Sequence, residues 1–155
     1  MDLIAIEEIR TLKYRYLRTL DLKQWDEFTD TLTADATAEY GTATQGRPLT
    51  FTNRDQIVSY MRDALGPAIT TVHSCTHPEI AIDGETATGS WCLEDTVLVP
   101  EYKLLIKGAA YYSDRYRRED GGWRICHTGY VRTYEATIPL GDLPGFKLTA
   151  NLWGG

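Results

Sequence analysis

An aspartate and a histidine that lie far apart in the chain have the residue types needed for proton transfer. Asp21 ends the first helical pattern, and His73 starts the first long strand pattern. A carboxylate that accepts the Nδ1 proton of an imidazole fixes its tautomer and raises its basicity. We therefore predict that Asp21 orients His73, and that His73 moves a proton on a small organic substrate. The spacing leaves a second interpretation open, in which Asp21 only caps the next helix and His73 is an ordinary strand residue.

Three further residues are candidates for a ligand pocket. Tyr16 lies on the apolar stripe of the first helix, so its hydroxyl should point inward and needs a partner there. Trp91 and Asp95 share one face of a predicted strand with Leu93 and Val97. We expect this face to line the pocket, where a buried carboxylate would need a partner.

Arg132 lies near the end of the last predicted strand and shares the parity of Tyr130 and Tyr134. A guanidinium is suited to a carboxylate, phosphate or carbonyl group of a ligand. A salt bridge at the surface or at an interface explains Arg132 equally well.

The other histidines, His77 and His127, compete with His73 for the same role. His77 has the strand parity of His73, so the two side chains are predicted to lie near each other. Three histidines suit zinc, but no H-x-H or H-E-x-x-H spacing joins them, and we predict no metal site. The chain also has no glycine-rich phosphate loop and no G-x-S-x-G motif.

Helical patterns fill most of the first 65 residues. Residues 3–20 form an amphipathic pattern in which Ile9, Leu12, Tyr16 and Leu20 recur at steps of three or four. A short second helix is predicted over residues 22–32. A third runs from a cap at Thr52 or Asn53 through Leu65, and Gly66-Pro67 stops it.

Strand patterns dominate the rest. A short strand over 34–40 precedes a polar loop over 41–50, and long strands are predicted over 69–82, 85–99, 104–118 and 122–134. Turn signals at Asp83-Gly84 and over 119–122 join them as hairpins. Because the strands are long, the sheet must curve strongly. We predict an α+β fold, a cone-shaped barrel with N-terminal helices packed on a strongly curved, mainly antiparallel sheet. The domain would span residues 1–136, and residues 137–155 would form an arm that packs on the barrel or on a neighbouring subunit.

Composition narrows the partners. The chain has 155 residues and a net charge of −6, which argues against nucleic acid and acidic membranes. It has no apolar run of 18 residues and no signal-peptide pattern at its N-terminus, so we predict a cytoplasmic protein. Cys75, Cys92 and Cys126 form no C-x-x-C pair and are expected to be reduced core residues.

Two segments resemble a known family. The segment from Ile9 to Ala36 resembles the N-terminal helices of the SnoaL-like branch of nuclear-transport-factor-2-like (NTF2-like) proteins. The second half agrees with the same family through Val72-His73, His77-Pro78-Glu79-Ile80, Asp83-Gly84, Gly121-Gly122-Trp123-Arg124-Ile125 and Arg132. The resemblance covers roughly residues 5–135. Within the family, the chain is most similar to the subgroup that contains scytalone dehydratase, bile-acid 7α-dehydratase and hexachlorocyclohexane dehydrochlorinase.

This subgroup consists of cofactor-free lyases in which a histidine acts as the base of an elimination. The resemblance implies the following roles: His73 as base, Asp21 as its orienting partner, Tyr16 and Tyr40 as hydrogen-bond donors, and Asp95 and Arg132 as secondary contacts. The chain departs from scytalone dehydratase at Leu20, where that enzyme has a tyrosine, and it lacks that enzyme's second histidine in the middle strands.

We predict that the protein is a lyase that needs no cofactor, either a dehydratase or a related elimination enzyme. An isomerase on the same scaffold begins with the same proton abstraction and stays open, as does a non-catalytic small-ligand-binding or scaffold protein. The aromatic and apolar lining expected for the pocket, with ten Tyr against three Phe, suits a small hydrophobic, aromatic or polycyclic substrate, such as a polyketide-, terpene- or steroid-like molecule. Apolar residues in the tail need cover, so we expect a homo-oligomer. The resemblance to lyases that are often trimers implies a trimer rather than a dimer.

Overall fold

The computed structural model describes residues 1–41 and 46–154. Its helices are α1 (Leu3–Asp21), α2 (Trp25–Asp30) and α3 (Arg54–Ala64). Its strands are β1 (Leu32–Gly41), β2 (Leu49–Phe51), β3 (Thr70–Asp83), β4 (Thr86–Val99), β5 (Leu104–Glu119) and β6 (Gly122–Pro139). Residues 42–45 of the predicted loop, and Gly155 at the end of the predicted arm, lie outside the described residues.

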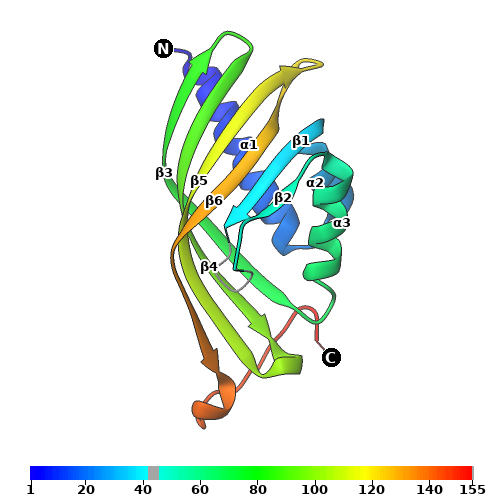
Figure 1. Cartoon of the computed structure of the whole chain (residues 1–155), viewed down its shortest axis with the longest axis vertical. Coiled ribbons are helices and arrows are strands. Elements are labelled where there is room, and N and C mark those ends of the chain that lie inside the picture. Colours follow the sequence, from blue (N-terminus) through cyan, green and yellow to red (C-terminus); the bar gives the residue numbers. More distant parts are fainter. Residues whose placement is uncertain (42–45, 155) are drawn as a thin grey trace.

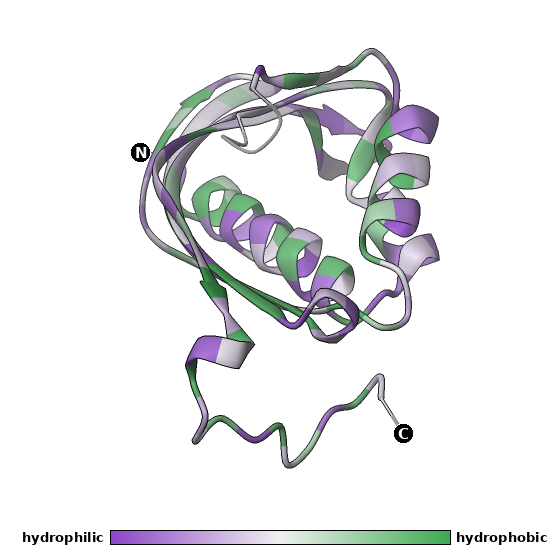
Figure 2. Ribbon diagram, turned by 60° about the horizontal axis from the view of Figure 1, so that its bottom comes forward, coloured by the Kyte–Doolittle hydropathy of each residue, from purple (hydrophilic) through white to green (hydrophobic). Residues whose placement is uncertain are grey.

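One sheet contains all these strands, in the order β2-β1-β6-β5-β4-β3. Neighbours are antiparallel except β1 and β6, which run parallel. The sheet curls around α1, with α2 and α3 at its side, and it is not closed into a full barrel (Figures 1 and 2). The predicted α+β class with helices on a curved sheet is confirmed; the short strand β2 was not predicted.

The curvature of the sheet has local causes. The pairing of β3 with β4 shifts register between Thr76 and Glu79, and the pairing of β5 with β6 shifts at two places. Such bulges bend a strand and increase its twist. The β5–β6 hairpin turns at Asp120 and Gly121, which both have positive φ, as a tight two-residue turn requires.

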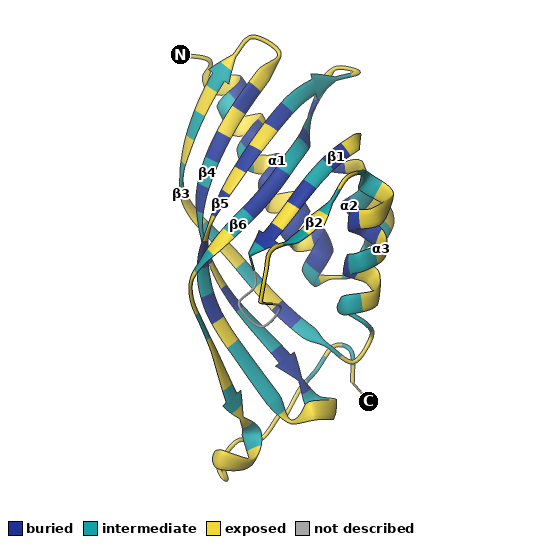
Figure 3. Cartoon of the chain, viewed as in Figure 1, coloured by how far each residue is buried: buried dark blue, intermediate teal, exposed yellow. Residues whose placement is uncertain are grey.

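Helix α1 lies in the concavity of the sheet and buries one face there (Figure 3). The carboxylate of Asp2 caps it by accepting from the backbone N–H of Ala5 at 3.0 Å. Its apolar core residues are Ala5, Ile9, Leu12, Tyr16, Leu17 and Leu20, at the spacing predicted. None of the helices in the described part of the chain is long and apolar enough to cross a membrane.

The chain beyond β6 returns to the start of β3. Strand β6 continues through Pro139, past the predicted boundary at residue 136. The side-chain oxygen of Asn151 accepts from the Thr70 hydroxyl at 2.9 Å, and the ring of Trp153 lies 5.0 Å from the ammonium of Lys23. The arm therefore packs on its own domain at the edge of the sheet. The three cysteines are free and only partly buried.

A buried ion pair joins α1 to the centre of the sheet. The Lys13 ammonium lies 2.8 Å from the Asp114 carboxylate, and both side chains are fully inaccessible to solvent. Asp114 also accepts from the hydroxyls of Tyr116, at 2.8 Å, and Thr128, at 2.7 Å. The same ammonium lies 3.4 Å from the centre of the Tyr112 ring. A buried charge is tolerated only when an opposite charge lies beside it. The pair therefore fixes the position of α1 against the sheet.

Replacing Lys13 with Met should leave the Asp114 carboxylate buried without a cation. We expect the free energy of unfolding to fall by about 3 kcal/mol or more, measured by urea denaturation. Lys13→Met combined with Asp114→Asn should cost less than the sum of the two single changes, because no unpaired charge remains. The exposed Lys107→Met variant is the control and should change little. Equal effects of Lys13→Met and Lys107→Met would contradict the role of the pair.

Candidate active site

The Asp21 carboxylate binds the His73 ring. Asp21 is the last residue of α1, and its Oδ1 lies 2.6 Å from His73 Nδ1. Oδ1 also accepts from the Thr71 hydroxyl at 2.8 Å, and Oδ2 accepts from the backbone N–H of His73 at 2.9 Å. Asp21 does not cap the next helix, because the N-cap of α2 is Gln24. The two residues predicted as a pair are thus brought together.

These contacts decide which nitrogen of His73 can accept a proton. Since a carboxylate only accepts hydrogen bonds, the neutral ring carries its proton on Nδ1. Nε2 then keeps its lone pair, and it has no partner among the described residues. The His73 side chain is 13% exposed, so most of the ring is packed. This arrangement suits a general base.

The turn after α1 holds Asp21 against β3. Lys23 has a positive φ of 56°, and its ammonium donates to the carbonyls of Leu65, at 2.9 Å, and Ile69, at 2.7 Å. Burial lowers the pKa of Lys23, and the nearby Asp21 charge opposes that shift. The ammonium therefore links the end of α1 to the segment that leads into β3, where Thr71 and His73 lie.

His73 faces a cavity of about 160 Å³ inside the curved sheet. Every helix except α2 and every long strand contributes to its wall. Its apolar lining includes Leu20, Met61, Leu65, Leu93, Val97 and Ile106. Its polar lining consists of Tyr40, Tyr60, Tyr112, Tyr130, Asp95, Arg132 and Glu135. The predicted residues Tyr40, Asp95 and Arg132 therefore share one cavity with His73.

Asp95 and Arg132 form an ion pair in the cavity wall. Arg132 Nη2 donates to Asp95 Oδ2 at 3.0 Å, Nη1 donates to Oδ1, and the Glu135 carboxylate lies 3.5 Å away. The guanidinium passes over Gly108, where any Cβ would collide with it. Burial alone would lower the pKa of Arg132, but the bonds to Asp95 outweigh it and the pKa is raised. The arginine is charged and largely neutralised, which suits a neutral polar group of a ligand more than a free phosphate.

Tyr16 stands behind Tyr40 rather than in the cavity. Their hydroxyls are 2.7 Å apart, and Tyr16 is completely buried. Either hydroxyl can donate to the other, but only Tyr40 lines the cavity, so a bound ligand can accept from Tyr40 when Tyr16 is the donor of this bond. The proton of Tyr40 is then free to point at a ligand. Burial raises the pKa of both phenols well above the ordinary value, so both are neutral donors near pH 7.

The structure places the remaining candidates elsewhere. Trp91 does not join the cavity: it is fully buried, and its indole N–H donates to the Tyr116 hydroxyl at 2.8 Å. His77 is displaced by the bulge in β3, is exposed and bonds the Thr76 hydroxyl. His127 bonds the Thr37 hydroxyl at 2.6 Å. Within residues 1–41 and 46–154, no three His, Cys, Asp or Glu side chains gather as metal ligands would.

Sequence reasoning missed Thr71 and Lys23 as parts of this site. Thr71 lies two residues before His73 on the same strand, so strand alternation puts both on one face and would have indicated it. Lys23 has no comparable signal, because its partners are two backbone carbonyls far away in the sequence. Tyr60, Tyr112 and Tyr130 were also missed as lining residues.

Comparison with known proteins agrees with the resemblance seen in the sequence. The fold is similar to the Kfla4162 protein of Kribbella flavida, with a TM-score of 0.77, 23% identity, and 88% of this chain and 95% of that chain covered. It is similar to a type 3 hexachlorocyclohexane dehydrochlorinase from Novosphingobium barchaimii, with a TM-score of 0.78, 17% identity, and coverage of 96% and 97%. It is also similar to a scytalone dehydratase candidate from Novosphingobium aromaticivorans, with a TM-score of 0.78, 15% identity, and coverage of 87% and 88%. Identities this low show the shared fold alone.

The family itself follows from a direct match. Residues 1–129 match the SnoaL-like domain, which takes in α1, the His73 strand and most of the cavity wall. The NTF2-like fold predicted from the two sequence segments is confirmed by the structural likenesses. The chain therefore belongs to the SnoaL-like domain family.

Proposed function

We propose that this protein is a cofactor-independent lyase that eliminates water or a halide from a small cyclic substrate. The observation that carries the proposal is the bond between His73 Nδ1 and Asp21, which leaves Nε2 without a partner among the described residues in a side chain that lines the cavity. The likeness to a dehydrochlorinase and to a scytalone dehydratase candidate supports the same class of reaction. An isomerase remains the second candidate, because it starts with the same proton abstraction.

The reaction begins when Nε2 of His73 takes a proton from a carbon next to an electron-withdrawing group. The electron pair of the C–H bond forms a carbon–carbon double bond, and the leaving group departs with its own bonding pair, either as a halide ion or, after taking the proton held by His73, as water. Asp21 stabilises the imidazolium that forms, because its carboxylate already accepts the Nδ1 proton. Tyr40 donates to the substrate oxygen or leaving group where negative charge develops.

The cavity volume limits the substrate. A closed apolar cavity of about 150 Å³ holds one benzene molecule, and the cavity beside His73 measures about 160 Å³. It therefore holds about one substituted ring, and because the cavity is only partly enclosed, a larger cyclic molecule would extend from it toward solvent. The tyrosines and the Asp95–Arg132 pair favour a ring that carries oxygen or halogen substituents.

His73→Asn should abolish proton abstraction, because an amide cannot take a proton at neutral pH. We expect a loss of about 10²–10⁴-fold in the rate of deuterium exchange or elimination, measured by NMR in D₂O on cyclic ketones with a β-hydroxyl or β-chloro group. His77→Asn is the matched control: it alters a histidine of the same strand that lies outside the cavity, and asparagine tolerates its positive φ. If both variants exchange deuterium as fast as the parent, the base is not His73. Exchange without elimination would instead favour the isomerase.

Thr71→Val should weaken the reaction through Asp21 rather than through the substrate. The valine removes one of three donors to the carboxylate, so His73 is oriented less well. Hydrogen bonds to charged groups contribute about 1.5–3 kcal/mol, and we expect kcat to fall about tenfold or more with KM nearly unchanged. Thr71→Ser should restore kcat. Thr70→Val is the control, because the Thr70 hydroxyl bonds Asn151 instead. Equal kinetic effects at both positions would argue against a positioning role.

Tyr40→Phe should remove the donor that faces the substrate and leave the Tyr16 hydroxyl without an acceptor. We expect kcat to fall about 10²–10³-fold, as for the loss of one donor to developing charge. Tyr16→Phe leaves Tyr40 free to donate, so its effect should be smaller. The ratio of the two kcat values, measured on one substrate, is the test. A larger loss in Tyr16→Phe than in Tyr40→Phe would reverse the assigned order of the two hydroxyls.

A further inference from the structure

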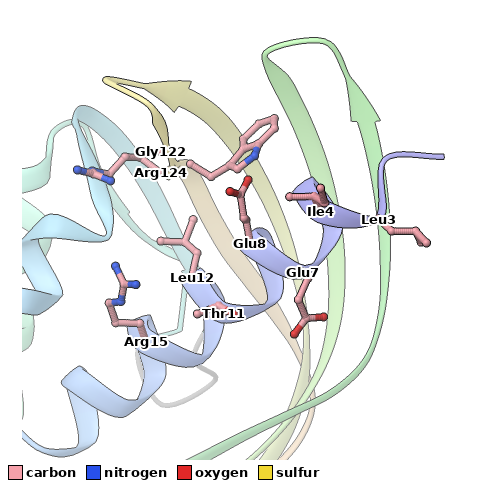
Figure 4. A pocket seen from close by; sticks show the side chains of 10 residues that line it. Leu3, Ile4, Glu7, Glu8, Thr11, Leu12, Arg15, Gly122 and Arg124 are labelled. Carbon is pink, nitrogen blue, oxygen red and sulfur yellow. The ribbon is translucent and has the colours of Figure 1, made fainter.

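A second hollow lies between the N-terminal half of α1 and the start of β6 (Figure 4). Its volume is about 550 Å³, and none of its lining residues lines the cavity beside His73. This groove is apolar along Leu3, Ile4, Leu12 and Trp123, and it carries Arg15 and Arg124 as its basic residues. A molecule bound in it would not contact the candidate active site.

The groove follows one face of α1. Ile4, Leu12 and Arg15 recur at helical spacing, and at 1.5 Å per residue the stretch from Ile4 to Arg15 spans about 16 Å. Leu3 and Ile4 are 66% and 74% exposed, so they present apolar surface to solvent at one end of the groove. An elongated apolar groove of this kind fits an extended chain better than a compact ring.

The acidic and basic side chains of the groove differ in whether they have an ion-pair partner. Its acids each have a cation nearby: Glu7 lies 3.6 Å from Arg10, and Glu8 lies 3.7 Å from Arg118. The guanidinium groups of Arg15 and Arg124, in contrast, have no partner among the described residues. Both arginines lie at the end of the groove away from Leu3 and Ile4 (Figure 4). Two uncompensated cations at one end of an apolar groove, in a chain of net charge −6, point to an anionic head group.

Trp123 forms part of the apolar wall of the groove. The residue is 4% exposed, and its indole N–H has no hydrogen-bond partner in the described structure. That nitrogen has almost no accessible surface, so a ligand in the groove would contact the ring of Trp123 and not its N–H.

We propose that the groove binds a single-chain amphiphilic carboxylate. The carboxylate pairs with Arg15 and Arg124, since a guanidinium matches its two oxygens. The hydrocarbon chain covers Leu12, Leu3 and Ile4 and so removes exposed apolar surface from water. This site does not depend on the lyase function, because it shares no residue with the His73 cavity.

Decanoate is the test ligand, titrated into the full chain by calorimetry. Arg15→Gln and Arg124→Gln should each weaken decanoate binding about tenfold or more. Arg62→Gln, which removes an exposed charge on α3, is the matched control and should bind like the parent. Thr11→Trp, at an exposed position of the groove wall, should block binding by filling the groove. Decan-1-ol and decyltrimethylammonium, which lack the anion, should bind much more weakly than decanoate.

Several results would overturn this site. Unchanged decanoate binding in both arginine variants would overturn it. Decanoate binding that is lost in Leu93→Trp, which fills the inner cavity, but kept in Thr11→Trp would also overturn it. No decanoate binding, together with a change of mass by light scattering in Arg15→Gln, would mean that a second copy of the chain covers the groove instead.

Discussion

The site depends on how the Asp21 carboxylate is held. A carboxylate at the C-terminal end of a helix faces the negative end of the helix dipole, which disfavours it. Three donors from β3 offset this cost: the Thr71 hydroxyl, the His73 main chain and the His73 ring. The same bonds fasten the end of α1 to the edge strand of the sheet. Orienting the base and closing the edge of the fold are therefore one set of interactions, and loosening either one disturbs the other.

The curved sheet explains why His73, the proposed base, lines a cavity. Bulges in β3 and along the β5–β6 pairing bend strands that would otherwise lie flat over α1. The Lys13–Asp114 pair holds the middle of α1 against the centre of that sheet, and Tyr112 lies between this pair and the cavity. The two sides of Tyr112 therefore have different roles. On one side the Lys13–Asp114 pair supports the helix, and on the other side Tyr112 lines the cavity proposed to bind a ligand.

Strand alternation predicted the site well only where the pairing is regular. The β4–β5 pairing has no register shift, and Leu93, Asp95 and Val97 line the cavity as their parity predicted. In β6 an extra residue opposite the Ala109–Ala110 step breaks the parity, so Arg132 lines the cavity while Tyr134 is exposed. Trp91 has the predicted parity but lies too far along β4, where the core is filled. The parity of a residue predicts which face of the sheet its side chain lies on. The position of the cavity along the strand depends on how all the elements pack, and the periodicity of the sequence does not encode that.

The charges of the cavity are matched to a proton transfer. Tyr40, Tyr60 and Tyr112 are neutral, because burial raises the pKa of each phenol, and Arg132 is balanced by Asp95 and Glu135. In the proposed reaction, His73 gains a proton next to the carboxylate of Asp21, to which its Nδ1 is hydrogen-bonded. The negative charge proposed to develop on the substrate would then face this imidazolium and the Tyr40 hydroxyl. Interactions between charges are strong in a medium of low dielectric constant. A proton transfer in an apolar cavity is therefore feasible when the positive and negative charges that it creates lie close to each other and to groups that stabilise them.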